Sequence, residues 1–262
     1  MSIATLAGEG YVPPDVNDVY PPALFDATPW LTKSIVLVTL SVFIIVTFLL
    51  AATRRPALVP GRLQFTGELI YSFVRNSMAR DVIGSKDFKP FVPLLFTFFT
   101  FILVNNVYGI LPLISFPPMA HIAYPMVLAL VALVVFNYVG IKRQGFFPYF
   151  KNMMFIPGVP WFVYPLLAPI ELISTIIVRP LSLTLRLFAN MFSGHLLLLV
   201  FITGSEYLML EVANPFLKAA GAATGALYIV LVFYELFVEI FQAYIFTLLA
   251  ALYIAGATSE GH

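Results

Sequence analysis

The chain has 262 residues, of which 61% are hydrophobic and only 10% are charged, and its formal net charge is +1. A soluble domain carries about 25% charged residues, so this composition indicates an integral membrane protein. The near-neutral charge argues against a nucleic-acid partner, and the lack of cysteine excludes disulfides, thiolate metal sites and cysteine catalysis.

Residues 1–30 hold acidic side chains and Pro-Pro pairs without an apolar period, so we expect an exposed segment before a single membrane domain over 31–262. This start lacks the basic and apolar regions of a cleaved signal peptide. Residues 34–52 are nearly all apolar and long enough to span a bilayer as a helix. Arginines follow at once. Because positive charge flanks the cytoplasmic side, the N-terminus is expected outside and residue 54 inside.

Three further segments follow in order. Residues 61–89 mix charged and apolar positions, which predicts an amphipathic helix at the inner surface. Residues 91–114 form a second span that contains Asn105 and Asn106. An amide pair at this depth needs partners, either through hydrogen bonds between helices or by lining a water path. Residues 122–141 form a third span, and basic residues after it again indicate the cytoplasmic side.

Residues 144–164 are rich in glycine, proline and aromatic residues, which indicates an interfacial connector. Two apolar segments then run over about 165–204 and 219–256, with Glu206, Glu211 and Pro215 between them. A bilayer core of about 30 Å needs about 20 helical residues, so helices of this length must tilt strongly or kink. The short connector predicts an antiparallel hairpin. The fold class is therefore an all-α membrane protein with about five membrane helices and one surface helix.

Arg186 is the residue of the first long segment that most needs an explanation. Arginine does not lose its charge in a protein, and an intramembrane charge is a functional hypothesis by default. Helical geometry gathers polar side chains into a narrow stripe along one side. His195 lies roughly half a turn from that stripe and is expected to face another side. The stripe comprises Thr175, Arg179, Ser182, Arg186, Asn190 and Ser193.

The second long segment carries Glu235, Glu239 and Gln242 at a spacing that places them on one helical face. Pairing of the two segments as a hairpin is expected to bring Gln242 near Arg186. Inner loops are basic, whereas the N-terminal segment and the 206–211 turn are acidic. An odd number of crossings then places the C-terminus inside.

A family resemblance rests on these two segments. The string Arg186-Leu-Phe-Ala-Asn190-Met-x-x-Gly194-His195, preceded by Arg179-Pro180-Leu-Ser182-Leu, resembles the signature of subunit a of the rotary F-type ATP synthase. The string Glu235…Gln242-Ala-Tyr-Ile-Phe-Thr resembles the last helix of that family. The likeness covers most of the chain after Arg54. It implies a membrane stator beside a ring of c subunits, held with peripheral-stalk b subunits in a larger complex.

The resemblance also implies two offset aqueous half-channels, one open to each side of the membrane, with Arg186 between them. A fixed cation favours the ionised form of a passing ring carboxylate, so that the proton leaves on arrival. It also repels a proton moving directly between the half-channels. The resemblance implies no cofactor and no metal, a subunit that is not an enzyme by itself, and the plasma membrane of a bacterium.

The outer half-channel is expected to be lined by Asn190, His195, Glu235 and Glu239. In some members of the family, acid and imidazole at the positions of His195 and Glu235 are exchanged, which suggests a coupled pair across the hairpin. The alternative for His195 is a satisfied buried histidine. A carboxylate at Glu239 has no counterpart in the family pattern, so it is either a second relay group or a partner of Arg186.

The remaining positions belong to the Arg186 level and the inner side. Gln242 is expected to hydrogen-bond beside Arg186 rather than conduct, and Ser182 to border the inner half-channel. Arg179 either lines that channel or extends to the interface. Glu171 either belongs to the inner exit or pairs with Arg179.

Two other functions compete with the stator. The main alternative is a self-contained ion-coupled transporter with a substrate site near the levels of Asn105, Asn106 and Arg186. For Arg186 alone, the alternative to a functional role is a structural ion pair with Glu235 or Glu239. We find no internal repeat that would support an inverted-repeat transporter. An intramembrane hydrolase has no paired-carboxylate, His-rich metal or Ser–His motif to support it.

Overall fold

The structure is a computed structural model that describes residues 11, 13–15, 32–54, 59–111, 116–154 and 160–258. These residues form helices and connecting segments without a β-strand, and five of the helices are long and apolar enough to cross a membrane. The all-α membrane fold is therefore confirmed. Most of the segment predicted to be exposed at 1–30 lies outside the described residues.

The first span, α1, runs over Lys33–Thr53 and confirms the prediction for 34–52. The predicted surface helix at 61–89 is shorter than expected. It comprises α2 (Arg62–Phe73), a π-helical turn (Val74–Arg80) and α3 (Asp81–Ile83). Gly84 ends it with φ +98°, a conformation that favours glycine. The prediction was wrong beyond Ile83 because the apolar period alone does not show where a helix ends.

The second span, α4, runs over Val92–Val107 and is shorter than the predicted 91–114. Tightened turns follow at Gly109 and Ile110. The third span, α5, covers Ala123–Gln144 and ends at Gly145, which has φ +86°. The predicted connector then contains a short helix, α6 (Phe146–Met154). Sequence patterns missed α6 because it is only two to three turns long and has a proline near its start.

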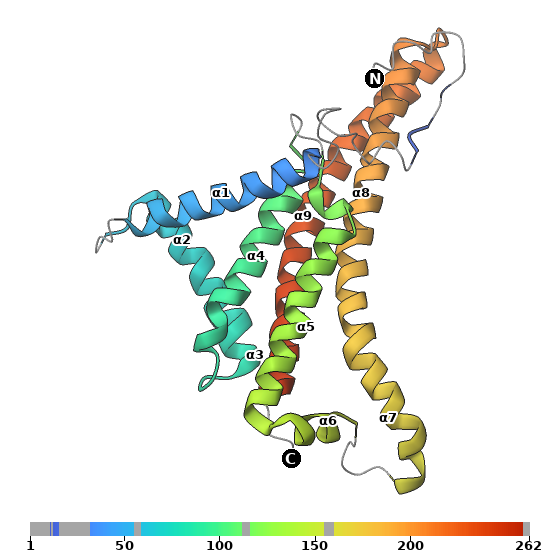
Figure 1. The fold of residues 1–262 in the computed structure, drawn as a ribbon. Helices are drawn as coiled ribbons and strands as arrows, with labels where there is room; N and C mark the ends of the chain where they lie inside the picture. Colours follow the sequence, from blue (N-terminus) through green and yellow to red (C-terminus); the bar gives the residue numbers. More distant parts are fainter. Residues whose placement is uncertain are drawn as a thin grey trace.

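The two long segments are confirmed. The first comprises α7 (Tyr164–Ile173), a π-helical turn (Ser174–Val178) and α8 (Arg179–Leu210), and the second is α9 (Pro215–Thr258). Both extend beyond their predicted ends, so Glu206 lies in α8 and the turn is confined to residues 211–214. Figure 1 shows that α7 bends away from the direction of α8 at the lower end of the hairpin.

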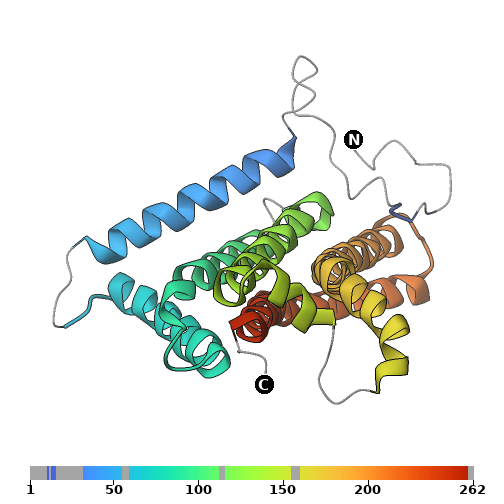
Figure 2. The same cartoon turned by 60° about the horizontal axis from the view of Figure 1, so that its bottom comes forward.

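The α8–α9 hairpin is the centre of the fold. Helices α4 and α5 pack along α9, and α5 also contacts α8. Figure 1 shows α1 crossing these helices at a wide angle, and Figure 2 shows α1 and α2 on the side of the bundle away from α8. If α1 crosses the bilayer upright, the long hairpin must be strongly inclined. The core that joins α8 to α9 includes Leu183, Leu187, Met191, Phe246 and Ala250.

The far end of the hairpin extends beyond α4 and α5 (Figure 1). A glycine allows close packing there, since a Cβ on Gly221 would lie 2.8 Å from Leu208 Cβ. Tyr11, in the segment predicted to be exposed, packs onto this part of α8. Its hydroxyl lies 3.1 Å from Thr203 Oγ1, and its ring lies 5.4 Å from the Tyr207 ring. The expectation of exposure was therefore wrong for Tyr11.

Candidate functional site

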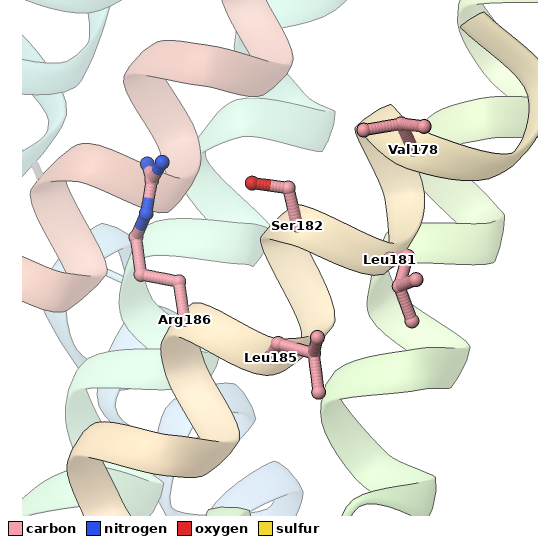
Figure 3. Close-up of a pocket in the computed structure, with 5 residues that line it drawn as sticks. All are labelled: Val178, Leu181, Ser182, Leu185 and Arg186. Atoms are coloured by element: carbon pink, nitrogen blue, oxygen red, sulfur yellow. The ribbon is translucent and has the colours of Figure 1, made fainter. Parts of the chain in front are cut away.

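Arg186 lies on an open face of α8. Its side chain is exposed, and none of the described residues forms an ion pair or a hydrogen bond with its guanidinium. It borders an open hollow of about 470 Å³. Figure 3 shows that Arg186 and Ser182 point to the same side from successive turns, whereas Leu181 and Leu185 extend away from them. A volume of this size accommodates side chains of a neighbouring helix as well as water.

Most of the predicted polar stripe shares this face. Ser182, Arg186 and Ser193 are exposed, and Arg179 and Asn190 are partly buried. Thr175 is an exception, because it is only 2% exposed. It lies in the π-helical turn, which advances the chain by more than 3.6 residues per turn. Extending the ordinary helical period through that turn placed Thr175 on the wrong face.

The acidic and imidazole groups lie inside the protein. His195 and Glu235 are each 7% exposed, Gln242 is 5% exposed and Glu239 is 1% exposed. The expectation that His195 would not share the face of Arg186 is confirmed. Within the described part of the chain, neither glutamate forms an ion pair. The proposed structural pairing of Arg186 with Glu235 or Glu239 is therefore not present in this structure.

Close approach at Gly194 sets the register of the hairpin. A Cβ at this position would overlap the Glu235 carboxylate. At the other end of the hairpin, Ser205 Oγ donates a 2.8 Å hydrogen bond to the Gly221 carbonyl. Following this antiparallel register toward the start of α8 brings Arg186 level with residues 242–244. The same register places Glu235 beside Gly194 and His195.

Gln242 is thus level with Arg186, as expected from the hairpin. No hydrogen bond joins the two side chains, because Gln242 is buried in the helix interface and Arg186 faces outward. The predicted hydrogen bond beside Arg186 is therefore absent from this structure.

Glu239 faces α4 rather than Arg186. Asn106 Nδ2 donates a hydrogen bond of 3.2 Å to the Glu239 carbonyl, and a Cβ on Gly109 would lie 3.2 Å from Glu239 Oε1. The other amide, Asn105, donates to Ser41 Oγ of α1 at 2.9 Å. The expected hydrogen bonds between helices are therefore confirmed for both asparagines.

Where α7 meets α8, Arg179 Nη2 lies 3.6 Å from Glu171 Oε1, which confirms the pairing expected as one of two alternatives. The Arg179 guanidinium also lies 5.4 Å from the Tyr253 ring of α9, a cation–π distance. Tyr149 of α6, which the sequence patterns did not single out, is buried nearby and donates to Asn137 Oδ1 at 3.1 Å. Burial raises the pKa of Tyr149, and the positive charge of Arg179 opposes this.

No group of three His, Asp or Glu side chains that could hold a metal ion occurs among the residues that the structure describes. The polar groups instead form two sets on one hairpin. One set is a partnerless cation on an open face, and the other consists of carboxyl and imidazole groups in the interior. Carboxyl and imidazole groups are chemically able to accept and donate protons.

The fold and the site define a multi-pass, all-helical membrane protein with ionisable groups inside the membrane domain. Residues 35–255 match the family model described as ATP synthase A chain. A protein named ATP synthase subunit a from Pseudarthrobacter chlorophenolicus is 44% identical, and the match covers 94% of this chain and 93% of the relative. A relative of the same name from Nocardioides sp. is 40% identical, and the match covers 99% of this chain and 98% of the relative. Another from Rhodococcus erythropolis is also 40% identical, with 97% of this chain and 93% of the relative covered.

The chain belongs to this family, the a subunits of the F-type ATP synthase. It is a membrane subunit of that complex and not an enzyme by itself.

Proposed function

We propose that the chain is the proton-translocating stator of its complex, with Arg186 separating two offset half-channels that serve the carboxylates of a c-subunit ring. The observation that carries this proposal is the Arg186 guanidinium on the open face of α8, which has no partner in the part of the chain that the structure describes. A permanent charge on a span is costly unless a partner or water meets it. A ring carboxylate that passes this face would be that partner.

The separation of charges along the hairpin supports a definite order of events. A protonated ring carboxyl arrives from the lipid and loses its proton beside Arg186, because the opposite charge favours the ionised form. After it has passed Arg186, it takes a proton from the other half-channel and returns to lipid neutral, when its burial costs much less. The same cation repels a proton that would cross directly between the channels.

The outer half-channel would use the buried groups of the hairpin. His195 and Glu235 lie at one level of the α8–α9 register and would act as a coupled pair that passes protons. An imidazole can accept a proton on one ring nitrogen and donate one from the other, which suits His195 to taking up and releasing protons. Asn190 would line this route between the pair and Arg186, and Glu239 would be a further relay group.

The inner half-channel would open along the lower part of α8. Ser182 shares the open face with Arg186 and would border its mouth. Glu171 and Arg179 are joined as an ion pair, and their side chains are partly exposed. We propose that this pair lines the inner exit, with Arg179 held in place by Glu171 and the Tyr253 ring. Gln242 would then help to fix the helix interface behind Arg186.

The proposed partners are the c ring, the peripheral-stalk b subunits and the rest of the ATP synthase. The proposed location is the plasma membrane of a bacterium, with the N-terminus outside and the C-terminus in the cytoplasm. Basic residues at the C-terminal ends of α1 and α5 support this orientation through the positive-inside rule.

Replacement of Arg186 with alanine tests the proposal. ATP synthesis driven by a proton gradient in membrane vesicles should be abolished, while the complex remains assembled on native gels. Lys218→Ala is the matched control, since it removes an exposed cation from the outer part of α9. Normal synthesis by the Arg186→Ala complex would reject the proposal.

A further inference from the structure

Helix α6 is held against the C-terminal end of α5, at the lower end of the bundle in Figure 1. Tyr149 of α6 is buried, and a Cβ on Gly140 would overlap its ring, so this glycine provides the room in which the ring packs. The Tyr149 hydroxyl donates to Asn137 Oδ1 at 3.1 Å, and Asn152 Nδ2 donates to Gln144 Oε1 at 3.1 Å. These contacts fix which face of α6 points away from the protein.

The outward face of α6 combines an apolar ring with a cation. Phe147 is 83% exposed, and Lys151 is exposed four residues later, so the two lie on one side of the helix. The same order recurs at the end of α5, where Tyr138 is 62% exposed and the Lys142 ammonium lies 5.9 Å from its ring centroid. Aromatic rings with a lysine near the end of a span are typical of the interface between acyl chains and headgroups.

The charges around these two pairs have one sign. Residues 88–170 include no acidic residue, and their basic residues are Lys89, Lys142, Arg143 and Lys151. Asp87, which precedes this stretch, pairs with Arg143. In the part of the chain that the structure describes, neither Lys142 nor Lys151 forms an ion pair. Both lysines are therefore available to an anion from outside the chain.

An anionic phospholipid fits both properties of this surface. Its acyl chains remove an aromatic ring from water, and its headgroup attracts lysine side chains near the membrane surface. Soluble phosphate would not account for the exposed rings. We propose that α6 and the end of α5 form a binding site for anionic phospholipids of the leaflet they face, with Phe147 and Tyr138 among the acyl chains and Lys142 and Lys151 at the phosphates.

Lipid at this site would hold the end of the bundle at a fixed depth. Gln144, which accepts the hydrogen bond from Asn152 of α6, also donates to the Ala257 carbonyl of α9 at 3.5 Å. An α6 that is bound to lipid would therefore fix the depth of the C-terminal end of α9 as well. The site does not depend on the exchange at Arg186, and only its assignment to the inner leaflet rests on the proposed orientation.

A spin label at position 147 tests what covers this face. Phe147→Cys is labelled in the purified complex, which is then placed in vesicles of phosphatidylcholine and phosphatidylglycerol. We expect oxygen, but not a water-soluble nickel complex, to relax the label. Glu211→Cys, at an exposed position in the hairpin turn, is the control and should show the reverse preference. Relaxation by nickel at 147 would place the face in water, and protection from both reagents would show that another protein covers it. Either result would overturn the proposal.

Removal of the lysine charges tests the preference for anionic lipid. A photoactivatable phosphatidylglycerol should label α6 in the unaltered complex, and unlabelled phosphatidylglycerol should compete better than phosphatidylcholine. Lys151→Gln should lower this labelling about fivefold, as expected for the loss of one cation at a membrane surface, and Lys142→Gln should also lower it. Lys218→Gln is the matched control, because it removes an exposed cation from the outer part of α9. Labelling that survives both substitutions, or equal competition by the two lipids, would overturn the proposal.

Discussion

Arg186 and Glu235 lie on the same helical hairpin, but their surroundings are opposite. The guanidinium is exposed and has no partner among the described residues, whereas the carboxylate is enclosed beside Gly194 and His195. Keeping the two apart prevents an internal ion pair that would neutralise both. In the proposed function, Arg186 meets a ring carboxylate and Glu235 exchanges protons with water.

Gly194 is expected to control the position of the Glu235 carboxylate. Gly194→Ala places a methyl group where that carboxylate lies, so the flexible acidic side chain must move while the backbone can stay. We expect ATP synthesis to fall toward the level of Glu235→Gln, a loss of roughly 10²-fold if the group transfers protons in the manner of a positioned acid or base. Assembly of the complex should be unchanged.

Two further variants separate this effect from a general defect. Gly256→Ala adds a methyl group in the same helix as Glu235 at a position with open space, and it should be nearly neutral. Combining Gly194→Ala with the shorter Glu235→Asp should recover part of the activity. An active Gly194→Ala complex would show that the carboxylate does not need its present position.

At the level of single residues, the sequence located the ionisable side chains within the spans better than it predicted what they touch. A charge or an acid in an apolar helix is visible in any hydropathy pattern. The α4 contact of Glu239 was not, because no local pattern states which neighbour a helical face will meet. The glycine at 194 was part of the recognised string, but only the structure shows that it makes room for Glu235.

Among the elements, the C-terminal end of α9 is held by α5 and by the loop after α3. Arg143 Nη2 lies 2.6 Å from Asp87 Oδ1, and Arg143 Nη1 donates to the Thr258 carbonyl at 3.4 Å. Gln144 Nε2 donates to the Ala257 carbonyl at 3.5 Å. These donors satisfy carbonyls that the last turn of a helix leaves unpaired, and a cation at this end also suits the helix dipole.

The Asp87–Arg143 pair gives this contact a defined pH dependence. The hydrogen bond from Arg143 lowers the pKa of Asp87 below its ordinary value of 3.8. A carboxylate with a lowered pKa adds stability above its unfolded-state pKa and loses it as the pH falls through the folded-state pKa. Asp87→Asn should therefore lower the Tm of the complex near pH 7, and the difference should disappear at a pH well below 3.8.

The effect should be small, because both partners are partly exposed to solvent. Thermal unfolding of the purified complex across this pH range measures it, with Asp81→Asn as a control for a carboxylate that has no ion pair in the described structure. A difference that persists unchanged in acid would show that Asp87 acts through something other than its charge.

The sequence predicted the positions of helices that have long apolar runs. It did not predict the short elements, which lack such a run. Five apolar runs predicted the five spans, because a bilayer requires helices of a minimum length. The helix ends, the short α6 and the π-helical turn at Ser174–Val178 depend on a few backbone angles. Hydropathy does not contain that information.

For the whole molecule, Figure 1 shows a wide angle between α1 and the α8–α9 hairpin, so an upright α1 would leave the hairpin strongly inclined in the bilayer. An inclined hairpin of this length presents more of its surface at mid-membrane than an upright span would. The orientation of the whole chain can be tested with single cysteines, because the native sequence has none.

Glu211→Cys, in the turn of the hairpin, should react with an impermeant thiol reagent on intact cells. Lys151→Cys, in α6, should react only after the membrane is opened, because basic residues flank the cytoplasmic side. The reverse labelling pattern would show that the chain has the opposite orientation to the one proposed. Equal labelling of both in intact cells would indicate a leaky preparation, which a cytoplasmic marker protein detects.

The most direct measurement is a map of the assembled membrane complex that resolves side chains where this subunit meets the ring. We expect Arg186 and Ser182 to face the ring carboxylates, with His195 and Glu235 turned away from the ring into the hairpin. A guanidinium placed among lipid headgroups, or on a side that no ring subunit approaches, would contradict the account.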